Sequence, residues 1–319
     1  MLGQYSWAEL SVFCIIVVAA LLVDLFAHKK DEAISMKNAA LWSLVWVALG
    51  LGFAVYVGYN HGREQSYLYL AGYLLEKSLS VDNLFVFMAI FSSFAVKDEY
   101  QHRVLYYGII GALILRLVFV AAGASLLAVF DDWALTAFGL FVLWSAWKMW
   151  QESRKPDHEI VDYTHHWAVS AARRFMPVSN KLDGHNFFTK IDGRRYMTPL
   201  FLCLATVEVA DVMFAFDSVP AIIAITQEPF LVYTSNIFAI LGLRSMYFLL
   251  AAAKRYLVHL EKSVIAILAF IGVKMLAQVI TGYHIPPMYS LMMVLGLLIV
   301  GIAASFAFPG PKEDRNSAD

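Results

Sequence analysis

The sequence has little charge, because Asp, Glu, Lys and Arg make up only 15% of its 319 residues. A soluble domain that is also 60% hydrophobic would lack the polar surface needed to cover it, so an integral membrane protein is indicated. The formal net charge of −1 excludes the strongly basic balance of nucleic-acid-binding proteins. Only two cysteines occur, Cys14 and Cys203, which excludes a disulfide framework and a thiolate zinc cluster.

Most of the sequence consists of long apolar segments. A membrane-spanning helix needs roughly 20 apolar residues, and by this rule the sequence predicts an all-α polytopic membrane protein with about nine transmembrane helices in a single domain, 1–319. The first run is long enough to span and follows no basic segment, so we do not expect a cleaved signal. The predicted spans lie at approximately 8–27, 38–59, 67–95, 104–129, 131–151, 199–225, 232–252, 261–281 and 286–307.

The distribution of lysine and arginine predicts the orientation. With the N-terminus outside and the C-terminus in the cytoplasm, 19 of the 24 basic residues lie on the cytoplasmic side and one, Arg63, lies outside. The other four fall within spans. The long polar segment 152–198 becomes a cytoplasmic loop, in which Phe187–Thr198 reads as a hairpin turning at Asp192-Gly193.

Five carboxylates fall inside two of these apolar runs. Each charge near a bilayer centre costs about 2.5–3.5 kcal/mol on insertion scales, so such residues are the default candidates for function. The five are Glu76, Asp82, Glu208, Asp211 and Asp217.

Their spacing predicts how they face. Glu208 and Asp211 are three residues apart and share one helix face. The spacing of six between Asp211 and Asp217, and between Glu76 and Asp82, does not fit one face, so either each pair meets different neighbours or the helix is interrupted. Three serines and a proline favour interruption, because they loosen helical hydrogen bonding. They are Ser78, Ser80, Ser218 and Pro220.

The donors in these segments are all hard oxygen ligands. Asn83 adjoins Asp82, and Asn236 and Ser80 are auxiliary candidates. With no Cys or His beside them, the set suits Mn²⁺, Mg²⁺ or Ca²⁺. Buried carboxylates can also exchange a proton for a cation, so protons are candidate counter-ions. No tightly bound cofactor is expected.

Four basic residues also lie inside spans: Lys77, Arg116, Arg244 and Lys274. They are candidate counter-ions, and the arginines are candidate gates that neutralise an empty site and move when a cation enters. The alternative is pure structural pairing of five acids with four bases. Because buried ion pairs contribute little to stability, an ion pathway is the preferred interpretation.

The charged residues recur in order along the chain. Asp211 lies 129 residues after Asp82, and Arg244 lies 128 residues after Arg116. Lys274 follows Lys148 by 126 residues. The sequence thus predicts two three-helix repeats, 67–151 and 199–281 (spans 3–5 and 6–8), which start on opposite sides of the membrane. Inverted repeats of this kind are typical of transporters.

Three motifs resemble those of the TerC family of bacterial membrane proteins: LEKSLSVDN at 75–83, VEVADVMFAFDSVPA at 207–221 and TSNIFAILGLR at 234–244. The match covers about residues 35 to 305 and is most like its Alx-type members. The resemblance implies tellurium resistance, manganese export from the cytoplasm and a place among the LysE-type exporters, which share an inverted three-helix repeat. It carries the motif acids over to the five carboxylates above, with Asn83 beside them.

The leading prediction is therefore a bacterial inner-membrane transporter that exports Mn²⁺ through a midplane carboxylate site, and not an enzyme. The alternative is a membrane assembly or stress-response scaffold that binds partners through 152–198; plant members of the family, linked to thylakoid protein insertion, keep this alternative open. An aspartic protease dyad within the membrane is disfavoured, because neither a Gly-x-Gly-Asp element nor a His-Glu-x-x-His motif is present. The expected partners are the bilayer, a divalent cation and protons.

Overall fold

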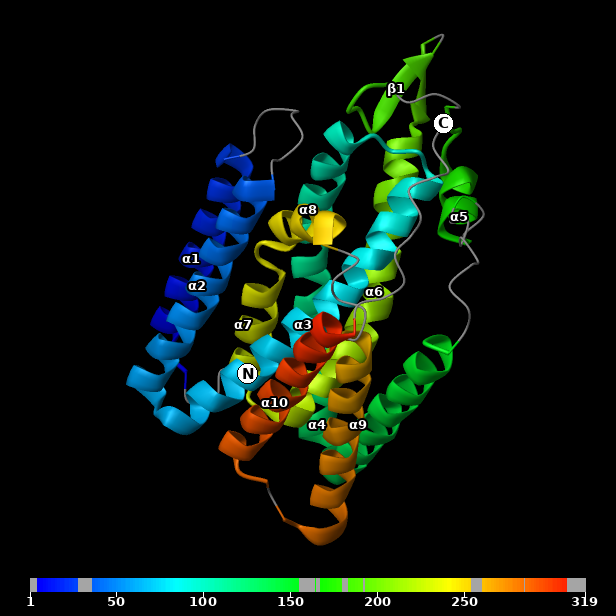
Figure 1. Ribbon diagram of the computed structural model, residues 1–319. Helices are drawn as coiled ribbons and strands as arrows, with labels where there is room; N and C mark the ends of the chain where they lie inside the picture. Colours follow the sequence, from blue (N-terminus) through cyan, green and yellow to red (C-terminus); the bar gives the residue numbers. More distant parts are fainter. Residues whose placement is uncertain are drawn as a thin grey trace.

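The computed structural model describes residues 5–27, 36–154, 164, 167–179, 183–191, 193–253, 260–283 and 285–308. Within these ranges the structure describes the backbone alone at 25–27, 82, 98, 152, 168, 217, 252, 253 and 260. In chain order the elements are α1 (Trp7–Ala27), α2 (Met36–His61), α3 (Arg63–Ser93), α4 (Asp98–Glu152), α5 (Trp167–Phe175), β1 (Phe188–Ile191), β2 (Arg194–Met197), α6 (Pro199–Ile225), α7 (Pro229–Ile240), α8 (Leu243–Ala253), α9 (Leu260–Thr281) and α10 (Pro287–Ala307) (Figure 1).

Six of the described helices are long and apolar enough to cross a membrane: α1, α2, α4, α6, α9 and α10. Helices α7 and α8, bent by 45° at a short break, bring the number to seven if the pair is one span. The predicted all-α, multi-pass membrane fold is confirmed at this level. The count of nine is not confirmed; it adds the charged helix α3 and divides α4 in two, and it stays a prediction.

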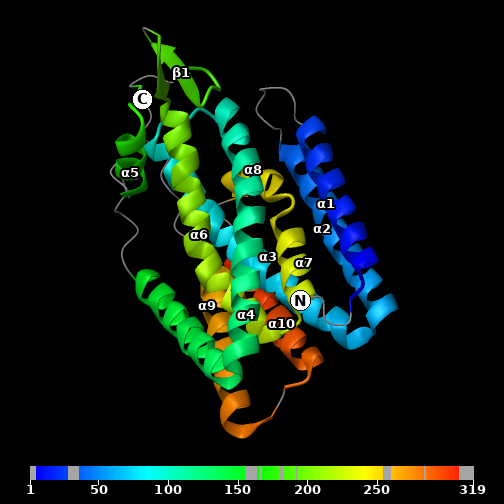
Figure 2. The same ribbon diagram turned by 180° about the vertical axis from the view of Figure 1, so that it is seen from behind.

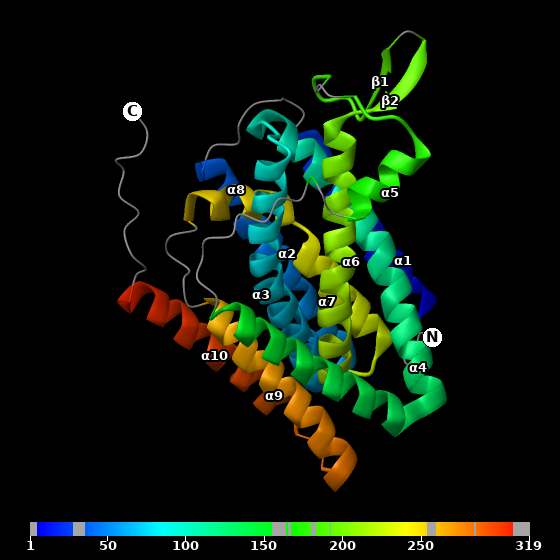
Figure 3. The same ribbon diagram turned by 90° about the vertical axis from the view of Figure 1, so that its right-hand side faces the viewer.

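Helix α4 is a single assigned helix of 55 residues with one non-helical residue inside it, Asp131, at φ 40° and ψ −114°. A positive φ is uncommon for a residue other than glycine. Figure 3 shows the chain turning sharply here, so that the second half of α4 runs beside α9. The bend falls at the start of the predicted span 131–151, on the first residue of the acidic pair Asp131-Asp132.

The helices pack around two hydrophobic clusters. One is rich in aromatic rings, with Phe53 and Phe238 at a centroid distance of 4.6 Å. The other is aliphatic and includes Val142, Ile222 and Ile271. Helix α3 packs against α2 and α7, while α4 packs against α6 and α9. Helices α1 and α2 form one edge of the bundle, away from α9 (Figures 1 and 2).

The predicted hairpin is confirmed. Strands β1 and β2 pair antiparallel, with Phe188 opposite Met197 and Ile191 opposite Arg194. Gly193 in the turn has φ +74°, as the Asp-Gly signal requires. The hairpin projects beyond the ends of the helices (Figure 3).

The prediction that the third and sixth spans are interrupted is wrong, because both are continuous helices. Helix α3 runs without a break from Arg63 to Ser93, and α6 runs through Pro220 to Ile225. Ser78 does donate to the carbonyl of Leu74, at 2.7 Å, but this bond leaves the helix intact. The chain breaks instead between α7 and α8, where Gly242 has φ +84° and Trp46 packs so closely that a Cβ on the glycine would lie 2.5 Å from the indole. Only glycine suits both conditions.

Candidate functional site

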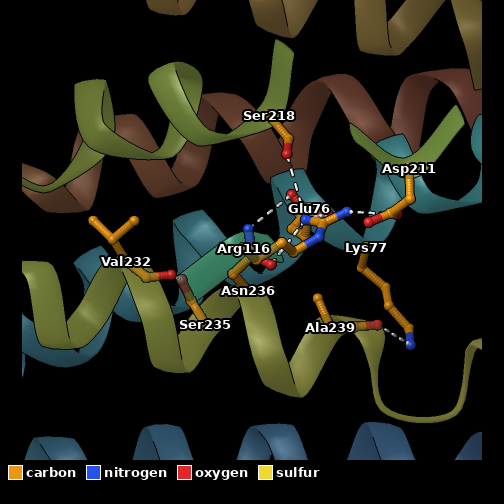
Figure 4. Close-up of polar contacts among 9 residues, drawn as sticks. All are labelled: Glu76, Lys77, Arg116, Asp211, Ser218, Val232, Ser235, Asn236 and Ala239. Carbon is orange, nitrogen blue, oxygen red and sulfur yellow. Dashed lines mark hydrogen bonds and ion pairs between the residues drawn. The ribbon is translucent and has the colours of Figure 1, made fainter. Parts of the chain in front are cut away.

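A buried arginine lies where four helices meet. Arg116 of α4 has no exposed surface and forms an ion pair with Glu76 of α3, which is also fully buried. Its Nη2 lies 3.4 Å from Oδ1 of Asp211 on α6. Its Nη1 donates to Oδ1 of Asn236 on α7 at 2.8 Å and to Oγ of Ser218 on α6 at 3.4 Å (Figure 4). Asn236 closes the network, because its Nδ2 lies 3.5 Å from Oε2 of Glu76.

The sequence dictates which side chains α6 contributes. Asp211 and Ser218 are seven residues apart, which is about two helical turns, so both face α4. The planar guanidinium carries five N–H donors in a fixed fork, so it can donate to several acceptors at once. A lysine ammonium in its place would lack this planar arrangement of donors. The Arg116 cluster, defined as Glu76, Arg116, Asp211, Ser218 and Asn236, therefore ties α3, α4, α6 and α7 together.

The Arg116 cluster has one guanidinium and two carboxylates, so it carries a surplus of negative charge when both acids are ionised. Oδ2 of Asp211 is buried and has no hydrogen-bond partner among the described residues. A buried acceptor without a donor is unfavourable, and either a proton or a cation would satisfy it. Oxygen acceptors in this arrangement suit a proton or a hard cation.

Glu208 lies one turn before Asp211 and also faces α4, as the spacing of three predicts. Its carboxylate lies against the backbone of Gly111, at the place where a Cβ on that residue would point. Within the part of the chain that the structure describes, no residue donates a hydrogen bond to Glu208 or forms an ion pair with it. Glu208 thus places a third carboxylate beside Glu76 and Asp211, and it has no ion-pair partner among the described residues.

The other basic residues of the spans lie elsewhere. Nη2 of Arg244 on α8 lies 3.0 Å from Oδ1 of Asp24 on α1. Asp24 is itself buried. Lys77 donates to the carbonyls of Ala239 and Leu241 rather than to a described carboxylate. Lys274 is buried on α9, and no described acid lies within ion-pair distance of it.

The remaining predicted residues are only partly described. Asn83 and Ser80 are buried on α3, and the hydroxyl of Ser80 has no described partner. The side chains of Asp82 and Asp217 lie outside the described residues. Among the residues that the structure does describe, no group of three or more His, Cys, Asp or Glu side chains is arranged to hold a metal ion. The six-residue metal site therefore stays a prediction.

Comparison with known proteins gives the family. The model of the integral membrane protein TerC family matches residues 61–313. The chain belongs to the TerC family. A relative named tellurium resistance protein TerC, from Serratia marcescens, is 48% identical over 330 residues, covering 95% of each chain. A relative named membrane-bound redox modulator Alx, from Escherichia coli K12, is 42% identical over 302 residues, covering 90% of this chain and 91% of its own. No solved structure matches this TerC-family chain.

Proposed function

We propose that this TerC-family protein is a divalent-cation transporter that exports Mn²⁺ from the cytoplasm across the bacterial inner membrane. The observation that carries the proposal is the surplus of buried carboxylate around Arg116, with Oδ2 of Asp211 unpartnered among the described residues. A purely structural network is expected to balance its charges, because an uncompensated buried charge is strongly destabilising. A surplus of negative charge at the junction of four helices suits a cation that binds and is released during transport.

The proposed ligands are oxygen donors throughout: Glu76, Asp82, Asn83, Glu208, Asp211 and Asp217, with Asn236 and Ser80 as auxiliaries. Such donors favour hard divalent ions over Cu⁺ or a thiolate-bound metal. Among the hard ions, Mn²⁺ is the one that the resemblance to the TerC family implies. Protons released and rebound by the carboxylates are the proposed counter-ions.

Arg116 is proposed as the gate. Its guanidinium lies between Glu76 and Asp211, so it neutralises part of the site when no cation is bound. An entering Mn²⁺ replaces the guanidinium as the partner of these acids, and Arg116 then turns toward Asn236 and Ser218, which already accept hydrogen bonds from it.

The proposal includes nine spans, an outside N-terminus and an inverted repeat of two three-helix units. The first unit consists of α3 and the two halves of α4, and the second consists of α6, the α7–α8 pair and α9. Helix packing supports this repeat. The first helix of one unit packs on the second of the other in both directions, α3 on α7 and α4 on α6. The third helices pack on each other through glycine, since a Cβ on Gly272 would lie 3.1 Å from the carbonyl oxygen of Gly139. A two-fold relation produces this pattern.

The test is Mn²⁺ flux in proteoliposomes containing the purified protein, with protein-free vesicles beside them. We expect saturable Mn²⁺ flux well above the protein-free background, reduced by Mg²⁺ or Ca²⁺ only in proportion to their affinity for the site. An absence of Mn²⁺ flux from folded protein, under every Mn²⁺ gradient and pH difference applied, contradicts the proposal. That result favours the scaffold alternative, in which residues 152–198 bind partners.

A further inference from the structure

The break between α7 and α8 lies inside the protein. Ile240 and Leu241 are buried, and the chain leaves helical geometry at Leu241 before Gly242 starts the 45° bend. The last carbonyls of a helix have no partner within it, and they carry the negative end of the helix dipole. In an apolar interior these oxygens need a cation or a donor.

Lys77 supplies both. Its Nζ donates to the carbonyl of Ala239 at 3.0 Å and lies 3.5 Å from the carbonyl oxygen of Leu241. Figure 4 shows the side chain extending from α3 to the end of α7, away from Arg116, although Lys77 is next to Glu76 in sequence. No described carboxylate lies within ion-pair distance of Lys77. Its ammonium is held by backbone oxygens.

Backbone oxygens at the end of a broken membrane helix are the ligands with which transporters hold monovalent cations. An ammonium is a compact charge with three donors, and it can occupy the same position. We propose that the α7–α8 break is a monovalent-cation site that the Lys77 ammonium occupies permanently, and that an alkali or small alkylammonium cation enters when this side chain is shortened. The inference goes beyond Mn²⁺ export and holds whether or not the protein transports Mn²⁺.

The experiment compares thermal unfolding of wild type, Lys77→Ala and Lys77→Met in detergent, in choline chloride and in equal concentrations of NaCl, KCl or n-propylammonium chloride. n-Propylammonium replaces the three methylenes and the amine that the alanine variant lacks. We expect wild type to unfold at one temperature in all four salts. Lys77→Ala should unfold roughly 5 °C lower in choline, because hydrogen bonds from a charged donor are lost, and should recover at least half of that shift with n-propylammonium or an alkali cation.

Two controls separate a site from a general salt effect. Lys77→Met fills the volume without charge, so it should stay destabilised in every salt. Lys274→Ala removes another buried lysine, one that makes no hydrogen bond to a carbonyl among the described residues, and n-propylammonium should not restore it. Recovery of Lys77→Ala no greater than that of Lys274→Ala overturns the proposal, as does an unchanged unfolding temperature for Lys77→Ala in choline. If Lys77→Ala yields no folded protein in choline, solubilisation with n-propylammonium must yield monodisperse protein; failure there also overturns the proposal.

Discussion

Replacing Arg116 with alanine is expected to lower the free energy of unfolding by about 3–5 kcal/mol, because Glu76 and Asp211 are then left buried without their shared counter-charge. Flux should fall to background in the same variant. Chemical denaturation in detergent measures the first effect and Mn²⁺ flux the second. The size of the effect follows from the complete burial of Arg116 and from its contacts to three helices.

Two further variants make this prediction specific. Arg103→Ala removes another arginine of α4, whose guanidinium lies over the rings of Phe187 and Tyr107. Because only these cation–π contacts are lost among the described residues, the free energy of unfolding should change by no more than about 1 kcal/mol. Adding Glu76→Gln to Arg116→Ala removes one of the two stranded charges and should recover part of the lost stability. Unaltered stability of Arg116→Ala, or a double variant less stable than the single one, would contradict the charge balance described for the Arg116 cluster.

Gly111→Ala is expected to reduce Mn²⁺ flux roughly ten- to a hundred-fold with little change in unfolding temperature. The added methyl group occupies the place of the Glu208 carboxylate, which lies at the end of a flexible side chain and can rotate away without moving the backbone. A ligand displaced by about 1 Å loses much of its contribution to a site that depends on geometry. Alanine also has the higher helix propensity, which offsets strain within α4.

The matched control is Gly108→Ala, one turn earlier on the same face of α4. A Cβ there lies 3.4 Å from Cγ1 of Val207, an ordinary packing distance, and approaches no carboxylate. Flux through Gly108→Ala should therefore remain near that of wild type. Equal losses in the two variants would show that close packing of α4 on α6, rather than the position of Glu208, explains the effect.

Residue patterns could predict the fold class, the hairpin and the helices that bear the site. Apolar runs of sufficient length require membrane helices, and Asp192-Gly193 requires a turn. The interruptions were misjudged because Pro220 and Ser78 are tolerated inside a helix surrounded by other helices. The real break depends on Trp46, which packs on Gly242 from a helix about 200 residues earlier, and no local signal carries that information.

The sequence could not predict which charged side chains pair with each other. Glu76 and Lys77 are neighbours, but successive residues project about 100° apart around a helix, so one meets Arg116 and the other meets the end of α7. Asp24 of α1 pairs with Arg244 of α8, although the two are 220 residues apart in sequence. The spacing of Glu208 and Asp211 did predict a shared face, since that relation lies within a single helix. Contacts between side chains on different helices depend on how the helices cross, which residue spacing does not specify.

The measurement that tests the central claim most directly is Mn²⁺ flux through Glu208→Gln beside wild type, with unfolding temperatures recorded for both. Glu208 has no described partner, so its charge contributes to no ion pair that the amide would break. If buried carboxylates form the ion pathway, flux falls to the protein-free background while the unfolding temperature stays within about 2 °C of wild type. Undiminished Mn²⁺ flux through a folded Glu208→Gln protein would contradict the account.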